Sequence, residues 1–287
     1  MKISVVIPTI GLQVEKTRSL ITFLCSLPDI VQDIVIVNQS TNSVIEEVQL
    51  PIKNISVSEY KVDWRGLSRA RNFGARIVSG YFVAFLDDDI AIGEKSLEAA
   101  CEFLVKNSNY AGVTGRAINA DGKASNVGKV DDYSRDIKLK TVSRATLEAT
   151  MVFRRDVFLK YFFNEMLGIG ALFGSCEGRD LIVRMLRNHE CLYFLYEYEV
   201  VHDDLPLSGH ATCKRYYYHG LGIGGYFLIH RDFKALFFEF LKNILACIYY
   251  IFRPALARRY LAKLSGILGA LSIGLPAGYS NDARINN

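Results

Sequence analysis

The sequence predicts an α/β fold in which a parallel sheet is covered by helices on both faces. Short, mostly apolar runs of four to six residues alternate with segments of helical spacing in the first part of the chain, and that alternation is typical of such a sheet. The chain has 287 residues, half of them hydrophobic. This is enough for one large domain with a C-terminal appendage.

The first elements follow directly from the pattern. Residues 3–7 form a β-rich apolar run that Pro8 closes, and residues 33–37 repeat it. The interval at 15–27 has helical spacing, so the chain begins with strand, helix, strand. A third strand is expected at 54–60.

The next segments continue the alternation. A helix is expected at 66–80, with Gly80 as its stop, followed by a fourth strand at 81–86. Residues 93–107 have the pattern of an amphipathic helix, and residues 111–118 that of another strand.

The later part of the first 210 residues is less regular. Residues 119–145 lack an apolar period and predict a long loop, for which function or mobility is the usual reason. A glycine-punctuated loop then leads into a helix that contains Leu181 and Met185 on one face. A strand-like run at 191–204 ends in a histidine and two acids.

Charge and cysteine usage narrow the functional class. A net charge of +4 and a pI near 8.6 are too mild for a nucleic-acid binder, so no such partner is expected. The cysteines are far apart, with no CxxC pair and no secretory leader before the first strand. We expect reduced thiols, mostly in the core of a cytosolic protein. They are Cys25, Cys101, Cys176, Cys191, Cys213 and Cys247.

Three consecutive carboxylates stand at the end of the fourth strand. Asp87, Asp88 and Asp89 close the run "YFVAFLDDD", and ligands of parallel α/β sheets bind beyond the carboxyl ends of the strands. Asp87 and Asp89 have the D-x-D spacing, which suits a divalent cation whose remaining ligands come from a diphosphate. The alternative is a solvated turn in which Asp89 caps the following helix.

Three segments together resemble a known family. "SVVIPT", "WRGLSRARNFGARIVSGYFVAFLDDD" and "GSCEGRDLIVRML" are similar, in this order, to glycosyltransferase family two enzymes over roughly residues 2–205. The resemblance implies the GT-A fold, a Rossmann-like, mixed and mostly parallel sheet flanked by helices. It also implies a nucleotide-diphosphate sugar donor, a divalent cation, Mn²⁺ or Mg²⁺, held by the D-x-D acids, and inversion at the sugar carbon.

The resemblance also implies a catalytic base in the segment Glu177-Gly178-Arg179-Asp180. Inverting transfer needs a carboxylate that takes the proton of the attacking hydroxyl. Glu177 is the first candidate and Asp180 the second. Many relatives have an Asp directly after the Glu, where this chain has Gly178. Alternatively, both acids simply stabilise the start of a helix through its dipole.

Polar residues at the strand ends are candidates for donor binding. Family members often have an Asp near Asn38, where this chain has an amide that can still hydrogen-bond a uracil or thymine edge. The expected donor is a UDP- or dTDP-linked sugar. An arginine in the "ARN" match is expected to contact the diphosphate, with a surface cation as the alternative. The candidates are Pro8, Thr9, Asn38, Asp63, Arg71, Asp87 and Asp88.

His202 falls where many of these enzymes have a histidine after a late strand. An imidazole is a plausible third ligand for Mn²⁺ beside Asp87 and Asp89. A lone histidine is otherwise structural or faces solvent.

The tail contains two long apolar stretches. Residues 235–252 carry only Glu239 and Lys242 as charges, and a second apolar helix is expected from about 256 to 275. Two charges near the middle make the first stretch a poor membrane span. Residues 234–263 contain six cations and one acid, which is the balance expected for an interfacial segment on anionic lipid. Packing on the core or on a dimer partner is the alternative.

These observations predict a peripheral glycosyltransferase that extends a bacterial surface polysaccharide, such as O-antigen or capsule, at the cytoplasmic face of the inner membrane. The acceptor is expected to be a lipid-linked saccharide. Whether the chain forms a homo-oligomer is left open. Residues 1–210 form the expected catalytic domain, with a nucleotide-sugar half at about 1–118 and an acceptor half at about 119–210. Residues 211–287 form the helical, membrane-associating region.

Two other classes remain open. A sugar nucleotidyltransferase shares the sheet topology and the metal acids, but "PTIGLQVEKTR" is a poor version of the Gly-rich signature that it needs. A non-catalytic, donor-binding partner subunit is expected to lose its carboxylates first, and here they are all present.

Overall fold

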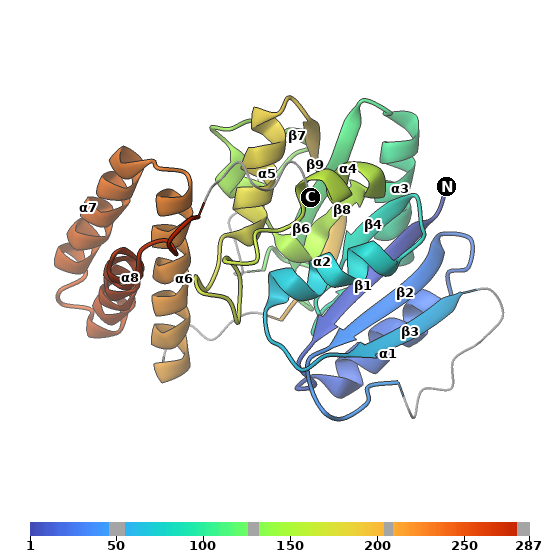
Figure 1. Ribbon diagram of the computed structural model, residues 1–287, viewed down its shortest axis with the longest axis horizontal. Coiled ribbons are helices and arrows are strands. Elements are labelled where there is room, and N and C mark those ends of the chain that lie inside the picture. Colours follow the sequence, from blue (N-terminus) through green and yellow to red (C-terminus); the bar gives the residue numbers. More distant parts are fainter. Residues whose placement is uncertain (46–54, 126–131, 204–208, 280–287) are drawn as a thin grey trace. The chain divides into compact units, whose positions relative to one another are not determined.

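The protein is described by a computed structural model for residues 1–45, 55–125, 132–203 and 209–279 (Figure 1). The chain divides into two compact units, and each is described by itself. The first unit comprises residues 1–65, 69–163 and 181–204, and the second comprises residues 66–68, 164–180 and 205–287. The domain ranges expected from the sequence, 1–210 and 211–287, stay a prediction.

The first unit is built on one nine-stranded mixed sheet. Its strand order is β3-β2-β1-β4-β8-β6-β9-β5, and β7 pairs with β9. The strands are β1 (Ile3–Thr9), β2 (Val31–Asn38), β3 (Ser56–Lys61), β4 (Phe82–Phe85), β5 (Ala91–Ile92), β6 (Tyr110–Ile118), β7 (Arg135–Asp136), β8 (Met151–Arg154) and β9 (Cys191–Val201).

The half of the sheet that contains β1 to β4 is parallel, as the sequence predicts. β1 pairs in parallel with β2 and β4, and β2 pairs in parallel with β3. β1 continues through Pro8, although a strand interior normally excludes proline. Because β4 pairs with β1 only as far as Val6, the missing N–H of Pro8 falls where β1 has a partner on one side only.

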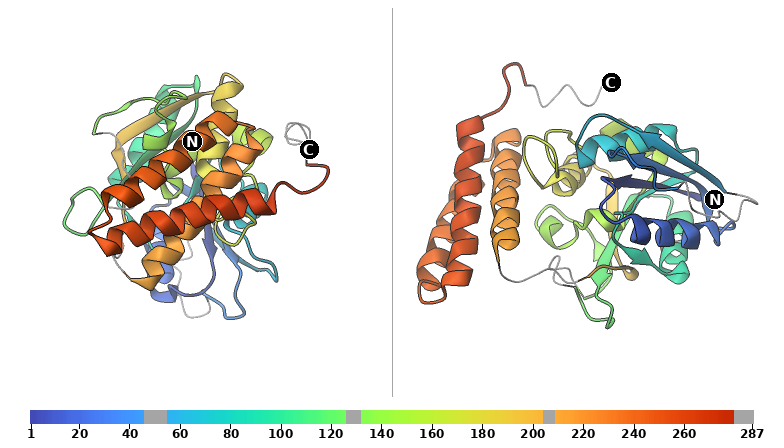
Figure 2. Two further views of the ribbon diagram at one scale, coloured as in Figure 1. Left: turned by 90° about the vertical axis from the view of Figure 1, so that its left-hand side faces the viewer. Right: turned by 90° about the horizontal axis from the view of Figure 1, so that it is seen from below.

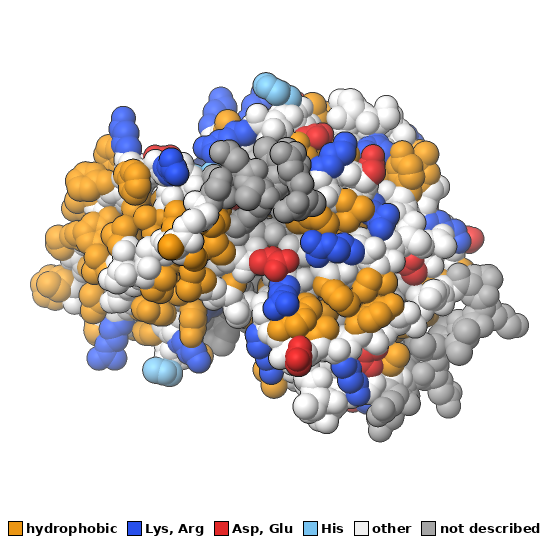
Figure 3. All heavy atoms as spheres, in the orientation of Figure 1, with side chains coloured by type: hydrophobic (Ala, Val, Ile, Leu, Met, Phe, Trp, Pro, Cys, Tyr) orange, Lys and Arg blue, Asp and Glu red, His pale blue; other side chains and the backbone are white. Residues whose placement is uncertain are grey.

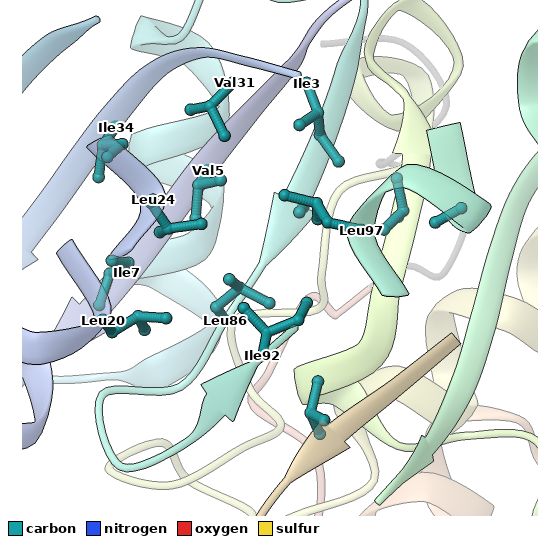
Figure 4. Packing of buried hydrophobic residues seen from close by; sticks show 14 of the residues in the cluster. Ile3, Val5, Ile7, Leu20, Leu24, Val31, Ile34, Leu86, Ile92 and Leu97 are labelled. Carbon is teal, nitrogen blue, oxygen red and sulfur yellow. The ribbon is translucent and has the colours of Figure 1, made fainter. Parts of the chain in front are cut away.

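Apolar side chains of β1 and β2 form the core of this half with helix α1 (Val14–Cys25). Ile3, Val5 and Ile7 of β1 point to the same side of the sheet, toward Leu20 and Leu24 of α1 (Figure 4). The alternate positions face helix α2 (Leu67–Ile77). Gly74 allows the close approach on that side, because a Cβ there would lie 2.4 Å from Val6 Cγ1.

The prediction that Gly80 ends α2 is wrong. The helix ends at Ile77. A Cβ at Gly80 would lie 2.7 Å from the backbone nitrogen of Ser4, so a glycine is needed for the chain to pass β1 before it enters β4.

The other half of the sheet explains why the fold is mixed. β8 is antiparallel to both β4 and β6, and β9 is parallel to β6 but antiparallel to β5 and β7. No strand is expected at β8, because three apolar residues and an arginine directly before a helix carry no periodicity. Helix α3 (Glu94–Lys106) precedes β6, and α4 (Arg155–Tyr161) follows β8.

The expected loop at 119–145 is confirmed in most of its described part. In this described part the regular structure is the two-residue strand β7, a 3₁₀ turn at Val142–Arg144 and an isolated bridge between Ile118 and Ala124. Residues 126–131 lie outside the described residues.

The second unit contains three long helices (Figure 2). They are α6 (His210–Ile229), α7 (Phe233–Tyr249) and α8 (Pro254–Ile273). α6 and α8 are in close contact, since a Cβ at Gly220 would lie 2.0 Å from the carbonyl oxygen of Lys263, and one at Gly266 would lie 2.0 Å from that of Tyr217. Two apolar helices are expected in the tail and both are present. α6 lies almost entirely within residues 211–287, which are expected to be helical, but no separate helix is predicted there because its glycines and tyrosines obscure the helical period.

Helix α5 (Glu177–Arg187) begins after a glycine-containing loop, as expected. Its residues up to Asp180 belong to the second unit and those from Leu181 to the first. Among the described residues, no helix is both long enough and apolar enough to cross a membrane.

All six cysteines lie in described residues and are free thiols. Only Cys25 and Cys101 are buried, while Cys191 is exposed and the remaining three are half-buried. The expectation that most of them belong to the core is therefore wrong. Cys176 lies directly before α5, Cys213 lies in α6 and Cys247 lies in α7, and all three are half-buried. The apolar period of the sequence does not indicate how far these positions are buried.

Candidate active site

The candidate site of the first unit lies at the switch point of the sheet, between β1 and β4, where successive strands are added on opposite sides of β1. From β1 the chain passes through α1 to β2 on one side, and later through α2 to β4 on the other side. The carboxyl ends of β1 and β4 therefore diverge, and a switch point of this kind is where open α/β sheets bind ligands. Thr9 ends β1, and Asp87, Asp88 and Asp89 follow β4.

A direct bond joins these two strand ends. The Thr9 hydroxyl donates to Asp88 Oδ2 at 2.5 Å, and the backbone N–H of Gly11 donates to the Thr9 hydroxyl at 3.0 Å. Thr17 of α1 donates to the backbone oxygen of Asp88 at 3.2 Å. Burial raises the pKa of Asp88, the charges of Asp89 and Asp87 raise it further, and the bond from Thr9 partly opposes them. The turn is therefore fixed from β1 and α1.

Arg71 holds the first carboxylate of the turn. Arg71 belongs to α2, its side chain is fully buried, and its Nη2 lies 2.7 Å from Asp87 Oδ1. The guanidinium also lies over the ring of Phe163, 5.4 Å from its centroid. The sequence predicts that Arg71 contacts the diphosphate. In the structure it contacts Asp87, so it sets the position of an acid that is itself 31% exposed.

Asp89 and His202 present two metal-ligating atoms to each other. His202 Nε2 lies 3.8 Å from Asp89 Oδ2. The other ring nitrogen, Nδ1, lies 2.7 Å from the backbone oxygen of Asp203, and because a carbonyl oxygen only accepts, Nδ1 carries the proton there. In a neutral imidazole the lone pair of Nε2 then faces the carboxylate, which is the arrangement of a histidine prepared for a metal.

These residues fit a cation that completes its ligand set elsewhere. In the described part of the chain, no group of three or more His, Cys, Asp or Glu side chains forms a metal site. Asp89 and His202 supply one oxygen and one nitrogen, and Mg²⁺ or Mn²⁺ commonly takes its further ligands from substrate phosphates and water.

Asn38 and Asp63 also lie at this edge of the sheet. Thr9 pairs with Asn38 at the ends of β1 and β2, and Asn38 pairs with Lys61 at the end of β3. Asn38 is fully buried, and its amide donates to the backbone oxygen of Asn42 and to Glu59 Oε1, both at 2.6 Å. Asp63 is exposed two residues after β3. Asn38 thus holds the loop after β2, while its contact with a base stays a prediction.

Glu177 and Asp180 belong to the second unit, where both are buried. Asp180 Oδ1 lies 3.0 Å from Nε2 of His230, and both side chains are almost inaccessible. Glu177 lies against the preceding loop, because a Cβ at Gly168 would be 3.2 Å from Glu177 Cδ. Gly168 has φ of +107°, so this position favours glycine for two reasons.

The backbone directly before Glu177 adopts an unusual conformation. Cys176 has φ of +74°, in the left-handed region that residues with a side chain seldom occupy. The next residue begins α5, so the orientation of Glu177 depends on this turn. Backbone conformations of this kind concentrate at functional sites.

Several residues that shape these sites are not evident in the sequence. Thr17 is recognisable only once α1 is placed beside Asp88. Glu59 accepts bonds from Ser43 and Asn38, which lower its pKa although burial opposes the shift. His230 directly follows the last residue of α6, and the sequence pattern gives no separate bounds for that helix.

Comparison with known proteins identifies the family. Residues 4–162 match the family described as Glycosyl transferase family 2, which is more than half of the chain. The chain belongs to glycosyl transferase family 2. It is therefore a glycosyltransferase of a family that uses nucleotide sugars, as the resemblance of its motifs implies. A sugar nucleotidyltransferase is not supported.

Solved structures agree on the fold. S. aureus TarS 1–349 matches with a TM-score of 0.56 at 18% identity, over 79% of this chain and 66% of that one. The same fragment in complex with UDP-GlcNAc gives a TM-score of 0.55 at 16% identity, over 79% and 67%. A longer TarS chain gives 0.55 at 19% identity, over 76% of this chain and 38% of that one. The likeness confirms the expected GT-A fold.

This chain thus spans about two thirds of the TarS fragment that it resembles. Among curated proteins, none matches it.

Proposed function

We propose that this family 2 enzyme transfers a sugar, with inversion, from a UDP- or dTDP-linked donor to a saccharide acceptor in a metal-dependent reaction. The observation that carries the proposal is the Asp89–His202 pair at the switch point of the sheet, 3.8 Å apart and next to the bonded Thr9 and Asp88. The donor diphosphate would bind beyond Thr9, where β1 and β4 diverge.

Asp89 and His202 would hold Mn²⁺ or Mg²⁺, with Asp87 positioned beside them by Arg71. A cation held there neutralises charge on the diphosphate as it leaves. Asp88, whose pKa is raised by burial, fixes the turn through Thr9. Pro8, Asn38 and Asp63 would shape the nucleotide side of the same edge.

Glu177 is proposed as the base, with Asp180 as the alternative. The acceptor hydroxyl oxygen attacks the anomeric carbon of the sugar, and its proton passes to the carboxylate. The bond from that carbon to the phosphate oxygen breaks, and its electron pair leaves with the nucleoside diphosphate. Glu177 is preferred because it is the first acid of the segment that the family resemblance implies, and because it begins α5 directly after the left-handed Cys176.

The acceptor is proposed to be a lipid-linked saccharide in the assembly of a bacterial surface polysaccharide such as O-antigen or capsule. This would place the enzyme at the cytoplasmic face of the inner membrane, with residues 235–275 as its membrane-contacting part. The proposal is supported by the basic and apolar composition of the tail.

A screen of nucleotide sugars by thermal stabilisation tests the donor proposal. A ligand that binds only the folded state raises the melting temperature. We expect UDP- or dTDP-sugars to raise it with Mn²⁺ present and to do so much less with EDTA. Stabilisation that is the same with and without metal would contradict a metal-dependent donor site.

A further inference from the structure

Helix α7 exposes most of its large apolar side chains. Only Leu236 and Asn243 are buried in it, the asparagine with 1% of its surface exposed. The exposed positions form an apolar stripe at helical spacing: Phe233, Phe237, Phe238, Leu241, Leu245, Ile248 and Tyr249. A helix that faces water carries polar residues on its outer face. The apolar stripe is therefore expected to contact an apolar partner rather than water.

Two polar residues, Glu239 and Asn243, lie on the less exposed side of α7 together with Leu236. Glu239 Oε1 lies 3.1 Å from Nζ of Lys263 on α8, and Glu239 Oε2 lies 3.2 Å from Lys242. Asn243 donates to the backbone oxygen of Glu239 at 2.7 Å. Burial alone would raise the pKa of Glu239, but the two ammonium groups outweigh it and lower the pKa to about 2. The charged groups thus hold α7 against α8 and leave the apolar stripe outside.

The turn between α7 and α8 extends the apolar surface. Ile251 and Phe252 are exposed, Phe252 to 95%, and Pro254 begins α8 directly after Arg253. Figure 3 shows hydrophobic side chains gathered over α7 and α8, with Lys and Arg around them. Arg258 and Arg259, in the next turns of α8, line a pocket with the start of α6. The exposed apolar pair Ile251–Phe252, called the tip here, is therefore followed directly by Arg253 and, one turn into α8, by Arg258 and Arg259.

The charge of the chain is concentrated in the same region. Residues 209–279 contain nine Lys and Arg but only two Asp and Glu, whereas the whole chain has 34 and 30. The rest of the chain is therefore slightly acidic. Exposed aromatic rings beside cations are the composition of helices that lie in the plane of an anionic bilayer surface.

We propose that the apolar stripe of α7 and the Ile251–Phe252 tip bind an anionic lipid bilayer, with the stripe at the boundary of headgroups and acyl chains. Lys234 and Arg253 then reach the lipid phosphates. A second copy of the chain is a weaker occupant, because pairing two such surfaces would bring together two sets of like charges. The inference deepens the proposed membrane contact by naming the face that makes it, and it does not depend on the glycosyl transfer.

Co-sedimentation of the full chain with vesicles of phosphatidylcholine, with and without phosphatidylglycerol, tests the proposal. The apolar variant is Phe237→Ser with Leu245→Ser, and its control is Tyr133→Ser with Leu139→Ser, two exposed residues of the first unit. The charge variant is Lys234→Gln with Arg253→Gln. Its control is Lys95→Gln with Lys106→Gln, two exposed lysines at the ends of α3.

We expect the wild type and both controls to bind the anionic vesicles. The charge variant should bind at least about tenfold more weakly, since each basic residue contributes roughly fivefold near an anionic surface. The apolar variant should lose binding to both kinds of vesicle. Equal binding by variants and controls would overturn the proposal. So would a wild-type dimer that the apolar variant splits while no form binds vesicles.

Donor-dependent thermal stabilisation is measured on the same preparations. If it is absent in the wild type while vesicle binding follows the expected order, the donor proposal fails and the membrane proposal stands.

Discussion

Arg71 illustrates how one buried side chain can determine the candidate donor site. It is fully buried, and it reaches a carboxylate that is partly open to solvent. The ion pair therefore fixes one rotamer of Asp87 from beneath, while the other face of the turn remains accessible. A positively charged surface residue, the alternative considered from the sequence, does not describe it.

Arg71→Met should destabilise the fold by about 1.5–3 kcal/mol, the usual contribution of a hydrogen bond to a charged group. The free energy of unfolding in urea measures this loss. Arg69→Met is the matched control, because Arg69 is exposed and lies over Trp64 at 4.3 Å, a contact of about 0.5–1 kcal/mol. Equal losses in the two variants would show that the Asp87 bond contributes nothing.

Glu177→Gln should lower turnover by about 10² to 10⁴ and leave donor affinity nearly unchanged, because the loss falls on proton transfer. Steady-state kinetics together with donor binding measure both quantities. Asp180→Asn should instead reduce the free energy of unfolding, since it disturbs the buried contact with His230. If Asp180→Asn gives the large loss in turnover and Glu177→Gln does not, the base has been assigned to the wrong acid.

At the scale of elements, local periodicity was sufficient for the parallel strands and for α1, α2, α3 and α5. It failed for β8, a strand of four residues that pairs with β4 and β6. Pairing with strands that are distant in the sequence produces no periodic pattern within the strand itself. It failed also for α6, where Gly220, Gly222, Gly224 and Gly225 weaken the helical pattern. Those glycines are explained by close contacts, such as that of Gly220 with α8, which no single segment encodes.

The ion pair of α7 and α8 predicts a specific response to acid. The folded pKa of Glu239, about 2, lies below its ordinary value of 4.5. Such a group stabilises the fold above its unfolded pKa, and the contribution is lost as pH falls from about 4.5 toward 2. Glu239→Gln should therefore lower the free energy of unfolding at pH 7 by about 1–2 kcal/mol and by only about a quarter of that at pH 2.5.

Urea denaturation of wild type and Glu239→Gln at the two pH values measures this difference. Glu102→Gln is a suitable control, since Glu102 is an exposed acid of α3 that pairs with the exposed Lys106. A difference between wild type and Glu239→Gln that persists undiminished at low pH would argue against the ion pair as its source.

At the scale of the whole molecule, the sequence located the three carboxylates at the correct edge of the sheet, because strand ends can be read from local pattern. It did not reveal which partner each carboxylate has. Asp87 meets Arg71, Asp88 meets Thr9 and Asp89 meets His202. These contacts arise from tertiary packing between segments that lie far apart in the chain. His202 was found only through the family resemblance, and His230 had no signal at all.

Charge is distributed unevenly along the chain. The segment 209–279 is strongly basic, and the remainder of the chain is slightly acidic. A mild overall charge therefore conceals a local basic surface, which is the physical basis for proposing a membrane rather than a nucleic acid as the partner of α7.

The central claim is that Asp89 and His202 hold a divalent cation together with the donor diphosphate, and calorimetry of UDP binding with and without Mn²⁺ tests it most directly. In the wild type, Mn²⁺ should strengthen UDP binding. In Asp89→Asn, with an unchanged circular dichroism spectrum, binding with Mn²⁺ should fall to the metal-free level, while Asp136→Asn, at the exposed strand β7, should behave as the wild type. Undiminished Mn²⁺-dependent UDP binding by Asp89→Asn would contradict the account.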